Sequence, residues 1–488
     1  MGEGMNPVEI GNLAGSAQFG PADREALEVL NPARPGDVVA RFPAATAEDA
    51  GRAVAASAAA ASGWAKTPQP RRAEVLRKAA DLIESRSPDL SEILCRENGK
   101  TINEARGEVA RTVQILRYYA GEGAQPMGTT VPSTSPKTVL MTFRRPLGTV
   151  AVITPWNFPM AIPAWKIAPA LVYGNTVVLK PSGLAPASAW ALVEAFREAG
   201  VPDGVLTFVT GQSRDIGPVL VSSPEVNALS FTGSGDVGLN LQREVIGRGG
   251  KVQLEMGGSN PTVVLDDAPV DRAVDIALGA AMRMAGQKCT ATSRTIVAAS
   301  MFSDFRDRLV ERAGEIRVGD PLDQATYMGP LITEAARADA LGAVEQAVGE
   351  GGRVIAGGGA IDGEGWFMEP TIVDSVEPGS SLGQAEVFGP VMSIYSAADD
   401  DEALRLANGT PFGLSASLVT NDLARTLRFA RGLEAGVIKI NSESAGLEFQ
   451  VPFGGTKASS SFSREQGKAA VEFFTEITTV YVDPVEER

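Results

Sequence analysis

The chain has 488 residues with 44 basic and 59 acidic side chains, which gives a formal net charge of −15. A single hydrophobic core stops growing near about 250–300 residues, so this length predicts more than one domain. The acidic balance, without a basic tract, argues against nucleic acid and against anionic membranes as partners. The sequence contains no histidine, which excludes a Ser-His-Asp triad, a Cys-His pair and a zinc site of the Cys/His kind. No metal site is expected.

Cysteine usage and the N-terminal residues indicate a compartment. The chain has only two cysteines, Cys95 and Cys289, which is typical of a reduced, cytoplasmic protein. The first residues lack a basic segment followed by an apolar stretch, so no secretory signal is expected. No window approaches the roughly 18 apolar residues of a membrane span.

The first third of the chain is predicted to be mostly helical. Residues 1–45 are expected to be loop-rich, and residues 46–83 and 90–121 show helical patterns. Residues 124–146 change character, with two proline-containing turns before a predicted strand at 138–143. That strand could pair with another lobe or with a partner subunit.

From Gly148 the pattern alternates between apolar strands and helices, and a second alternation runs from Pro261 to Asn441. Predicted strands of the first alternation cover residues 150–153, 175–179, 205–209, 226–231 and 251–254, with a helix at 185–199. Buried strands alternating with helices predict parallel sheets covered on both faces. The last segment, residues 476–482, reads as a strand.

A glycine-rich loop follows the predicted strand 226–231. The run Gly233-Ser234-Gly235-Asp236-Val237-Gly238 matches G-x-G-x-x-G and is expected to open a helix near Leu239. Bare amides at a helix N-terminus bind a pyrophosphate. The next strand ends in Glu255, where a dinucleotide fold would place a ribose-binding acid. In a chain with 53 glycines the pattern alone also fits an ordinary turn.

Cys289 is the candidate nucleophile, because a thiol is strongly nucleophilic even without a base partner. The alternative is that it is a small buried hydrophobe, as most cysteines are. Cys95, in the helical stretch 91–97, is expected to be structural.

Several motifs together resemble the aldehyde dehydrogenase superfamily, in its order and at its spacing, over about residues 25–485. They are Thr154-Pro155-Trp156-Asn157-Phe158-Pro159, Lys180-Pro181-Ser182, Phe231-Thr232-Gly233-Ser234, Leu254-Glu255-Met256-Gly257-Gly258, Gly286-Gln287-Lys288-Cys289, Glu386-Val387-Phe388-Gly389-Pro390 and Pro452-Phe453-Gly454-Gly455. Within that superfamily, the stretches 162–171 and 445–455 look most like α-ketoglutaric semialdehyde dehydrogenases.

The resemblance implies an α/β architecture in three parts. A Rossmann-like cofactor-binding domain would comprise residues 1–126 and 147–256, and an α/β catalytic domain residues 257–457. A small β oligomerisation element would combine residues 127–146 and 470–488. Homodimers or homotetramers are expected.

The resemblance also implies a mechanism for oxidising an aldehyde to a carboxylate. Cys289 would attack the aldehyde carbon, and the Asn157 amide with the Cys289 backbone N–H would hold the oxyanion of the thiohemiacetal. After hydride transfer, Glu255 would activate water to hydrolyse the thioester, rather than bind ribose. Three candidates could favour the thiolate: Lys288, a helix N-terminus and the positive charge of the bound nicotinamide.

The cofactor is expected to be NADP, with NAD as the alternative. The residues expected to contact it are Thr154, Pro155, Trp156, Lys180, Ser182, Gly183, Gly233, Ser234, Gly238, Glu386 and Phe388. Gly183 stands where NAD-preferring members often carry Glu. Without that carboxylate, Lys180 and Ser182 could bind a 2′-phosphate; the alternative is that glycine merely relaxes selectivity.

The substrate is expected to be a short aldehyde that bears a carboxylate. Arg283 lies six residues before Cys289 and resembles the arginine with which succinate semialdehyde dehydrogenases bind the substrate carboxylate, although the second arginine of that clamp is missing. Alternatively, Arg283 forms an internal ion pair. The predicted substrate-contacting residues are Phe158, Trp165, Arg283, Lys288, Phe449 and Gln450.

Three other functions fit the same residues. An aromatic tunnel would equally suit a hydrophobic or aromatic aldehyde. A CoA-acylating enzyme of the same fold would resolve the thioester with a thiol, and Glu255 argues against it. A non-catalytic protein with this fold is disfavoured by the intact set of Asn157, Glu255 and Cys289.

Overall fold

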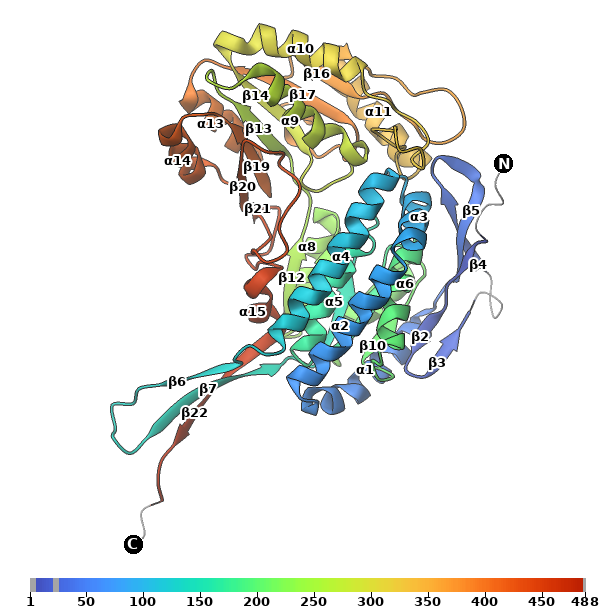
Figure 1. Ribbon diagram of the computed structural model, residues 1–488, viewed down its shortest axis with the longest axis vertical. Helices are drawn as coiled ribbons and strands as arrows, with labels where there is room; N and C mark the ends of the chain where they lie inside the picture. The colour runs from blue at the N-terminus through green and yellow to red at the C-terminus, as the bar shows by residue number, and fades with distance from the viewer. Residues whose placement is uncertain (1–5, 21–25, 486–488) are drawn as a thin grey trace.

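The computed structural model describes residues 6–20 and 26–485. The expectation about a secretory signal concerns residues that include 1–5, which lie outside this part of the chain. Two seven-stranded sheets dominate the molecule, one in the upper lobe and one in the lower lobe of Figure 1. Within the described residues, no helix is long and apolar enough to cross a membrane.

The expectation of a loop-rich N-terminal segment is wrong, because five strands lie there. They are β1 (Val8–Glu9), β2 (Asn12–Ala14), β3 (Ala17–Phe19), β4 (Ala26–Asn31) and β5 (Arg34–Pro43). β2 joins the sheet of the lower lobe beside β10 (Leu206–Phe208), nearly two hundred residues later in the chain. β2 depends on this remote partner, which local periodicity does not reveal, whereas β2–β3 and β4–β5 are local antiparallel pairs.

Four helices follow, where two helical runs were predicted. They are α1 (Ala47–Lys66), α2 (Gln69–Ser85), α3 (Ser87–Asn98) and α4 (Ile102–Glu122). The first run breaks at Thr67, because Pro68 disfavours helical backbone in the residue before it. The second breaks at Gly99, which adopts a left-handed conformation with φ +85°. Thr101 then caps α4 through a capping box with Glu104.

The first large sheet has the strand order β12-β11-β8-β9-β10-β2-β3. Its parallel strands are β8 (Thr149–Ile153), β9 (Thr176–Lys180), β10, β11 (Val226–Thr232) and β12 (Lys251–Glu255). Its later helices are α5 (Ala161–Val172), α6 (Pro186–Glu198), α7 (Ser213–Ser222) and α8 (Gly235–Gly247). Apolar side chains of α2 to α6 pack on one face of the sheet, and those of α1, α7 and α8 on the other. α8 begins at Gly235, one turn earlier than predicted.

The second large sheet has the order β15-β16-β17-β14-β13-β19-β20 and only one antiparallel pair, β15 with β16. Its strands are β13 (Asn260–Val264), β14 (Thr292–Ala298), β15 (Arg353–Ala356), β16 (Thr371–Asp374), β17 (Val391–Ala397), β19 (Ser415–Val419) and β20 (Val437–Ile440). The helical elements around it are α9 (Val270–Met282), η2 (Arg283–Gly286), η3 (Ala299–Met301), α10 (Phe302–Gly314), α11 (Glu334–Gly349), α12 (Ser381–Gln384), α13 (Asp400–Asn408) and α14 (Leu423–Gly432). A separate apolar core lies in this lobe. Both predicted α/β alternations are therefore confirmed.

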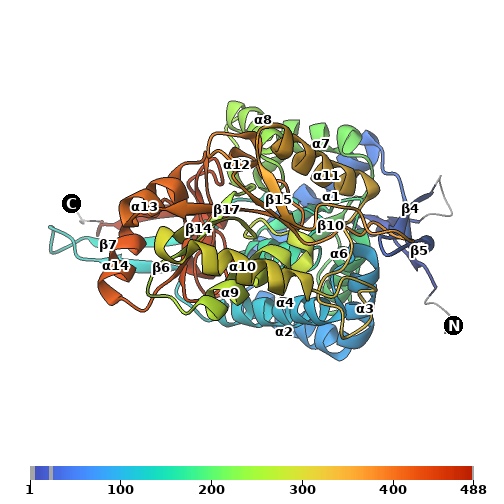
Figure 2. The same ribbon diagram turned by 90° about the horizontal axis from the view of Figure 1, so that it is seen from above.

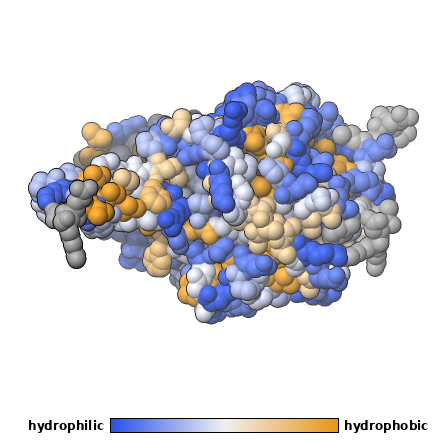
Figure 3. All heavy atoms as spheres, turned by 90° about the horizontal axis from the view of Figure 1, so that it is seen from below, coloured by the Kyte–Doolittle hydropathy of each residue, from blue (hydrophilic) through white to orange (hydrophobic). Residues whose placement is uncertain are grey.

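An arm projects from the body (Figures 1 and 2), built from β6 (Gly128–Val131), β7 (Val139–Pro146) and β22 (Thr475–Val482) in the order β22-β7-β6. The strand predicted at 138–143 thus pairs with the C-terminal strand of its own chain. Figure 3 shows hydrophobic atoms gathered on this projection, and Ile477 and Tyr481 are 59% and 68% exposed. The remaining short elements are β18 (Phe412–Gly413), β21 (Thr456–Lys457), η4 (Gly467–Ala469) and α15 (Ala470–Phe474).

The predicted domain limits stay a prediction. The large sheets draw their strands from residues 12–19 and 149–255 and from residues 260–440, and the arm lies outside both.

Candidate active site

A cavity of about 440 Å³ brings together residues from both large lobes. Glu255 enters it from the carboxyl end of β12, and Cys289 from the turn between η2 and β14. Ligands of parallel sheets bind at the carboxyl ends of the strands, and this cavity follows that rule. Two residues that sequence motifs predicted separately thus line one cavity.

The segment before Cys289 has an uncommon backbone. Met284, Ala285 and Gly286 all have φ between +51° and +70°. A Cβ on Gly286 would lie 2.0 Å from the Gly389 carbonyl oxygen, so only glycine fits there. Glu104 accepts a hydrogen bond from the Met284 amide at 2.9 Å, across the boundary between lobes. Left-handed backbone costs free energy in non-glycine residues, so the surroundings must hold this turn in place.

Asn157 is buried next to the same turn. Its Oδ1 accepts from the Phe158 amide at 3.1 Å, which fixes the orientation of the side-chain amide. Its Nδ2 then faces the Cys289 turn and donates to the Gln287 carbonyl at 3.2 Å. The Asn157 backbone carbonyl accepts from Lys100 Nζ at 2.7 Å.

A buried ion pair underlies that loop. Lys100 pairs with Glu108, and both side chains are almost completely buried. The second oxygen of Glu108 accepts from the Met160 and Ala161 amides at 3.0 and 3.1 Å, at the start of α5. Lys100 and Glu108 therefore tie α4 to the loop that carries Asn157.

Glu255 is buried, and its carboxylate is only half satisfied. Its Oε2 accepts from Ser460 Oγ at 2.7 Å, whereas Oε1 has no partner among the residues that the structure describes. Burial raises the pKa of Glu255 well above its usual range, and the nearby Glu465 adds to the shift. Glu465 itself is neutralised by Lys166 and accepts from Trp165 Nε1 at 2.7 Å. A carboxyl group with a raised pKa is suited to proton transfer near neutral pH.

The surroundings of Cys289 disfavour its thiolate form. Burial raises its pKa, and the carboxylates of Glu386 and Glu255 raise it further. A helix N-terminus as the source of thiolate stabilisation is wrong, because Cys289 follows a 3₁₀ turn and precedes a strand. Lys288 lines the same cavity, but burial lowers its own pKa, and its Nζ donates to the Gly279 carbonyl at 3.5 Å.

At the start of α8, two glycines pack closely against apolar side chains. A Cβ on Gly233 would lie 2.5 Å from the Phe231 ring, and one on Gly238 would lie 2.9 Å from Met256 Sδ. Ser234 is the N-cap residue of α8 and makes no side-chain capping bond. The hydroxyls of Thr154 and Thr232 are buried without a partner in the described part of the chain. Glycines at a helix N-terminus with free hydroxyls nearby fit a dinucleotide pyrophosphate.

The catalytic lobe contributes the other side of this surface. Glu386 accepts from the Gly258 amide at 3.0 Å, and burial raises its pKa to about 7. A Cβ on Gly257 would lie 1.9 Å from the Glu386 carboxylate, so a larger residue there would displace that side chain. Phe388 has φ +56°, and its ring meets Trp156, which follows Pro155 in the chain, edge-on at 5.5 Å. Trp156 of the first lobe and Phe388 of the second are thus in direct contact.

Lys180, Ser182 and Gly183 lie at and just after the end of β9. Burial lowers the pKa of Lys180 to about 8, and its Nζ donates to the Pro181 carbonyl at 3.2 Å. Ser182 Oγ accepts from the Leu184 amide at 3.2 Å. A Cβ on Gly183 would make one ordinary contact, with the Phe42 ring at 3.6 Å, so a side chain has room there.

The cavity wall is partly aromatic. Of the residues predicted to contact substrate, four line it: Phe158, Trp165, Arg283 and Lys288. Phe449 and Gln450 are not among the residues that line it, and their contact with substrate stays a prediction. The Phe449 ring instead packs against Tyr118 at 5.7 Å and Arg111 at 5.2 Å. Gln450 is exposed and donates to Glu448 at 3.4 Å.

Arg283 has an internal partner, as the alternative interpretation held. Its guanidinium lies 3.7 Å from Glu443, near the Tyr327 ring, and its side chain is 53% exposed. Arg283 and Glu443 also line an adjoining cavity of about 650 Å³, so the pair stands where the two cavities meet.

The sequence analysis did not predict one wall of the cavity, which α4 forms. Glu104, Gly107, Glu108, Arg111 and Gln114 of α4 all line the cavity. Their spacing is that of one helix face, a signal that the sequence contained. Without the partner face, such a stripe is indistinguishable from any polar helix surface.

Comparison with known proteins identifies the family. Residues 19–480 match the Aldehyde dehydrogenase family. The chain is 44% identical, over 94% of its length and 95% of the relative's, to an α-ketoglutaric semialdehyde dehydrogenase of Bacillus subtilis (strain 168). It is 37% identical, over 93% of both chains, to a succinate-semialdehyde dehydrogenase [NADP(+)] of Escherichia coli (strain K12). A betaine aldehyde dehydrogenase from Staphylococcus aureus, solved in complex with NAD⁺, superimposes with a TM-score of 0.94 at 30% identity, over 98% of this chain and 95% of that one.

The chain therefore belongs to the aldehyde dehydrogenase family, and the resemblance predicted from its motifs is confirmed. It is an aldehyde dehydrogenase that oxidises an aldehyde with NAD or NADP. The glycines at the start of α8 and the unpaired threonine hydroxyls fit such a cofactor.

Proposed function

We propose that this enzyme oxidises a short aldehyde that carries a carboxylate. The observation that supports it best is a cavity that joins Cys289 and Glu255 to the guanidinium groups of two arginines, Arg111 and Arg283. Guanidinium groups bind carboxylates with paired, charge-assisted hydrogen bonds. The relatives named for α-ketoglutaric and succinic semialdehydes point to the same substrate class.

The proposed chemistry uses this chain's own side chains. The Cys289 thiol passes its proton to water, its sulfur attacks the aldehyde carbon, and the Asn157 amide and the Cys289 backbone N–H hold the oxyanion of the thiohemiacetal. The nicotinamide cofactor supplies the hydride acceptor when it is bound. Glu255 then takes a proton from water, the water oxygen attacks the thioester carbon, and the Cys289 sulfur leaves to give the carboxylate.

NADP is the proposed preferred cofactor, with NAD as the alternative. The proposed contacts are Thr154, Pro155, Trp156, Lys180, Ser182, Gly233, Ser234 and Gly238 from the first lobe and Glu386 and Phe388 from the second. Support for NADP comes from the open position at Gly183 beside the cationic Lys180. Because residue 183 is glycine, no carboxylate at that position would repel the 2′-phosphate of NADP.

The arm is proposed to mediate a homodimer or homotetramer. β22 and β6 are edge strands, and the arm exposes apolar side chains. Exposed edges with apolar side chains are prone to pair with another chain. Two free cysteines are consistent with a reducing compartment, so a cytoplasmic location stays part of the proposal.

A second candidate is a hydrophobic or aromatic aldehyde, favoured by the rings of Phe158, Trp165 and Phe453 in the cavity wall. A CoA-acylating reaction is disfavoured, because thiol attack needs no base such as Glu255.

An aldehyde panel with both cofactors tests the proposal. It compares kcat/KM for succinic and α-ketoglutaric semialdehydes with hexanal, benzaldehyde and glyceraldehyde. We expect the acidic aldehydes to be at least about tenfold better, as one charge-assisted contact implies. Equal values for acidic and neutral aldehydes would refute the substrate class. Aldehyde-dependent NADPH formation by Cys289→Ala would refute the mechanism.

A further inference from the structure

Arg111 is a cavity-lining arginine whose guanidinium has no hydrogen-bond or ion-pair partner in the described part of the chain. It lies on α4, on the same helix face as Glu104 and Glu108, and it is half-buried. The structure shows no hydrogen bond or ion pair to its guanidinium from any residue in the described ranges. Its one close contact is the Phe449 ring, 5.2 Å from Cζ. Burial lowers the pKa of Arg111, and the charge of Glu448 partly offsets the effect.

Besides Glu255, three glutamates line the cavity, and each of them has a donor. Glu104 accepts from the Thr101 and Met284 amides, and Glu108 pairs with Lys100. Glu443 lies beside Arg283. Each of these three glutamates therefore already has a donor, and none of them is an ion-pair partner of Arg111.

The two arginines of the cavity thus differ. Arg283 is 53% exposed and paired with Glu443 at the junction with the outer cavity. Arg111 is half-buried and unpaired. A partly buried cation without a counter-ion is costly, and an anionic ligand removes that cost. Arg111 is also pre-oriented against an aromatic ring, which reduces the side-chain entropy lost when it binds an anion.

We propose that Arg111 forms the inner carboxylate subsite of this enzyme, which receives the far end of an acidic aldehyde while Cys289 takes its carbonyl. The proposal rests on the proposed function and makes it more specific: Arg111 is the principal anchor, and Arg283, held by Glu443, contributes less. The missing second arginine of the predicted clamp is thereby supplied by α4, from a different part of the sequence.

The test compares Arg111→Met with two matched variants. Arg283→Met removes the paired arginine, and Arg106→Met removes an exposed arginine of α4 that lies outside the cavity lining. Each enzyme is assayed with succinic semialdehyde and with pentanal, a neutral aldehyde. For Arg111→Met we expect kcat/KM to fall about 10–100-fold with succinic semialdehyde and less than about threefold with pentanal. Arg283→Met is expected to lose less, and Arg106→Met to match the wild type.

A second measurement does not depend on an acidic aldehyde being the substrate. Succinate is tested as an inhibitor of pentanal oxidation, and Arg111→Met is expected to weaken its inhibition constant by about tenfold or more. Equal losses with both aldehydes, or unchanged inhibition by succinate, would overturn the Arg111 subsite. A wild-type enzyme without preference for succinic semialdehyde would instead overturn the proposed substrate class, whatever the variants do. Arg111→Lys should regain part of the loss, because it restores the charge without the planar fork.

Discussion

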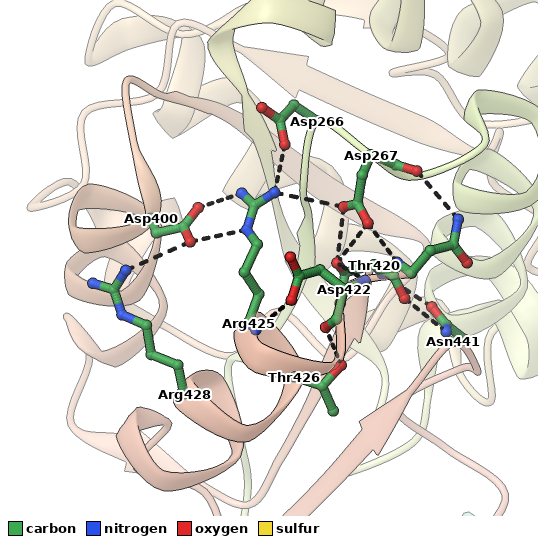
Figure 4. A network of polar contacts seen from close by, with 10 residues as sticks. Asp266, Asp267, Asp400, Thr420, Asp422, Arg425, Thr426, Arg428 and Asn441 are labelled. Carbon is green, nitrogen blue, oxygen red and sulfur yellow. Dashed lines mark hydrogen bonds and ion pairs between the residues drawn. The ribbon is translucent and has the colours of Figure 1, made fainter.

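Two clusters of charged groups in this protein differ in how completely their members are paired. At the end of the catalytic sheet, Arg425 of α14 contacts the carboxylates of Asp266, Asp267 and Asp400 (Figure 4). In the active-site cavity, Arg111 contacts no carboxylate among the described residues, and Glu255 keeps one oxygen without a donor.

The difference separates structural from functional charge. The network around Arg425 joins α13 and α14 to the end of β13, and its arginine is saturated with acceptors. The cavity groups are left with unused hydrogen-bonding capacity, which a folded chain tolerates where a ligand or water will satisfy it. Substitutions at the first cluster should therefore change stability, and those at the second should change activity.

The largest expected effect is that of Glu255→Gln. Removing the base should lower kcat by about 10²–10⁴-fold while the thioester still forms. The reason is that Glu255 is proposed to activate the water that hydrolyses the thioester, a step that comes after thioester formation. Rapid mixing should then show a burst of NAD(P)H followed by a slow phase. The thermal midpoint should stay near that of the wild type. A slow reaction without a burst would mean that the substitution impairs a step before thioester formation.

Arg425→Met should show the reverse pattern. It leaves three carboxylates without their shared cation, and we expect a loss of about 2 kcal/mol in stability, seen as a lower thermal midpoint. The kcat/KM of the folded enzyme should not change. Arg405→Met is the matched control, because Arg405 is 65% exposed and pairs only with Glu402 among the described residues. Equal destabilisation by both variants would contradict the structural role of the network.

Gly183→Glu tests whether an added charge in the proposed cofactor site changes the choice between NADP and NAD. The space around Gly183 admits a side chain, and a carboxylate there would repel a 2′-phosphate near Lys180. We expect the ratio of kcat/KM for NADP to that for NAD to fall at least about tenfold. Gly183→Gln, which adds similar bulk without charge, should change the ratio less. A wild-type ratio that already favours NAD tenfold would contradict the proposed preference.

The smallest effect concerns pH. The pKa of Glu386 is raised to about 7, so its carboxyl group is mainly protonated below that pH and ionised above it. Only the ionised form accepts hydrogen bonds from ribose hydroxyls through both oxygens, so KM for NAD should fall by up to about tenfold from about pH 6 to pH 8. The raised pKa means that burial favours the neutral acid, so the contribution of this group to stability is lost as pH rises through 7. Glu386→Gln should remove the pH step in KM.

Much of the fold and the central chemistry could be predicted from the sequence. Strands such as 150–153 and 226–231 are apolar runs that report burial locally, and both appear in the first sheet. The motifs around Asn157, Glu255 and Cys289 were recognisable together, in the order and at the spacing of the family. The five N-terminal strands were not, because β1 to β3 are only two or three residues long and β2 joins its sheet beside the remote β10.

The candidate substrate wall was predicted only in part. Phe449 and Gln450 lie just before the motif that begins at Pro452, yet they are not among the residues that line the cavity. Arg111 carried no motif and lies within it. Chain direction after a turn and the packing of one helix against another decide such placements, and neither is encoded in spacing alone.

The sequence by itself determined the family and named the candidate reacting groups, because the proposed nucleophile, base and oxyanion donor each lie in a short motif whose chemistry needs those residue types. Only the tertiary structure decided which charges are paired. Lys166 and Glu465 meet across 299 positions, and Arg283 finds Glu443 while Arg111 is left with none. Ion pairs depend on distances of a few ångströms between elements that fold together, so the charge left unpaired in the cavity emerges only once every other partner has been placed.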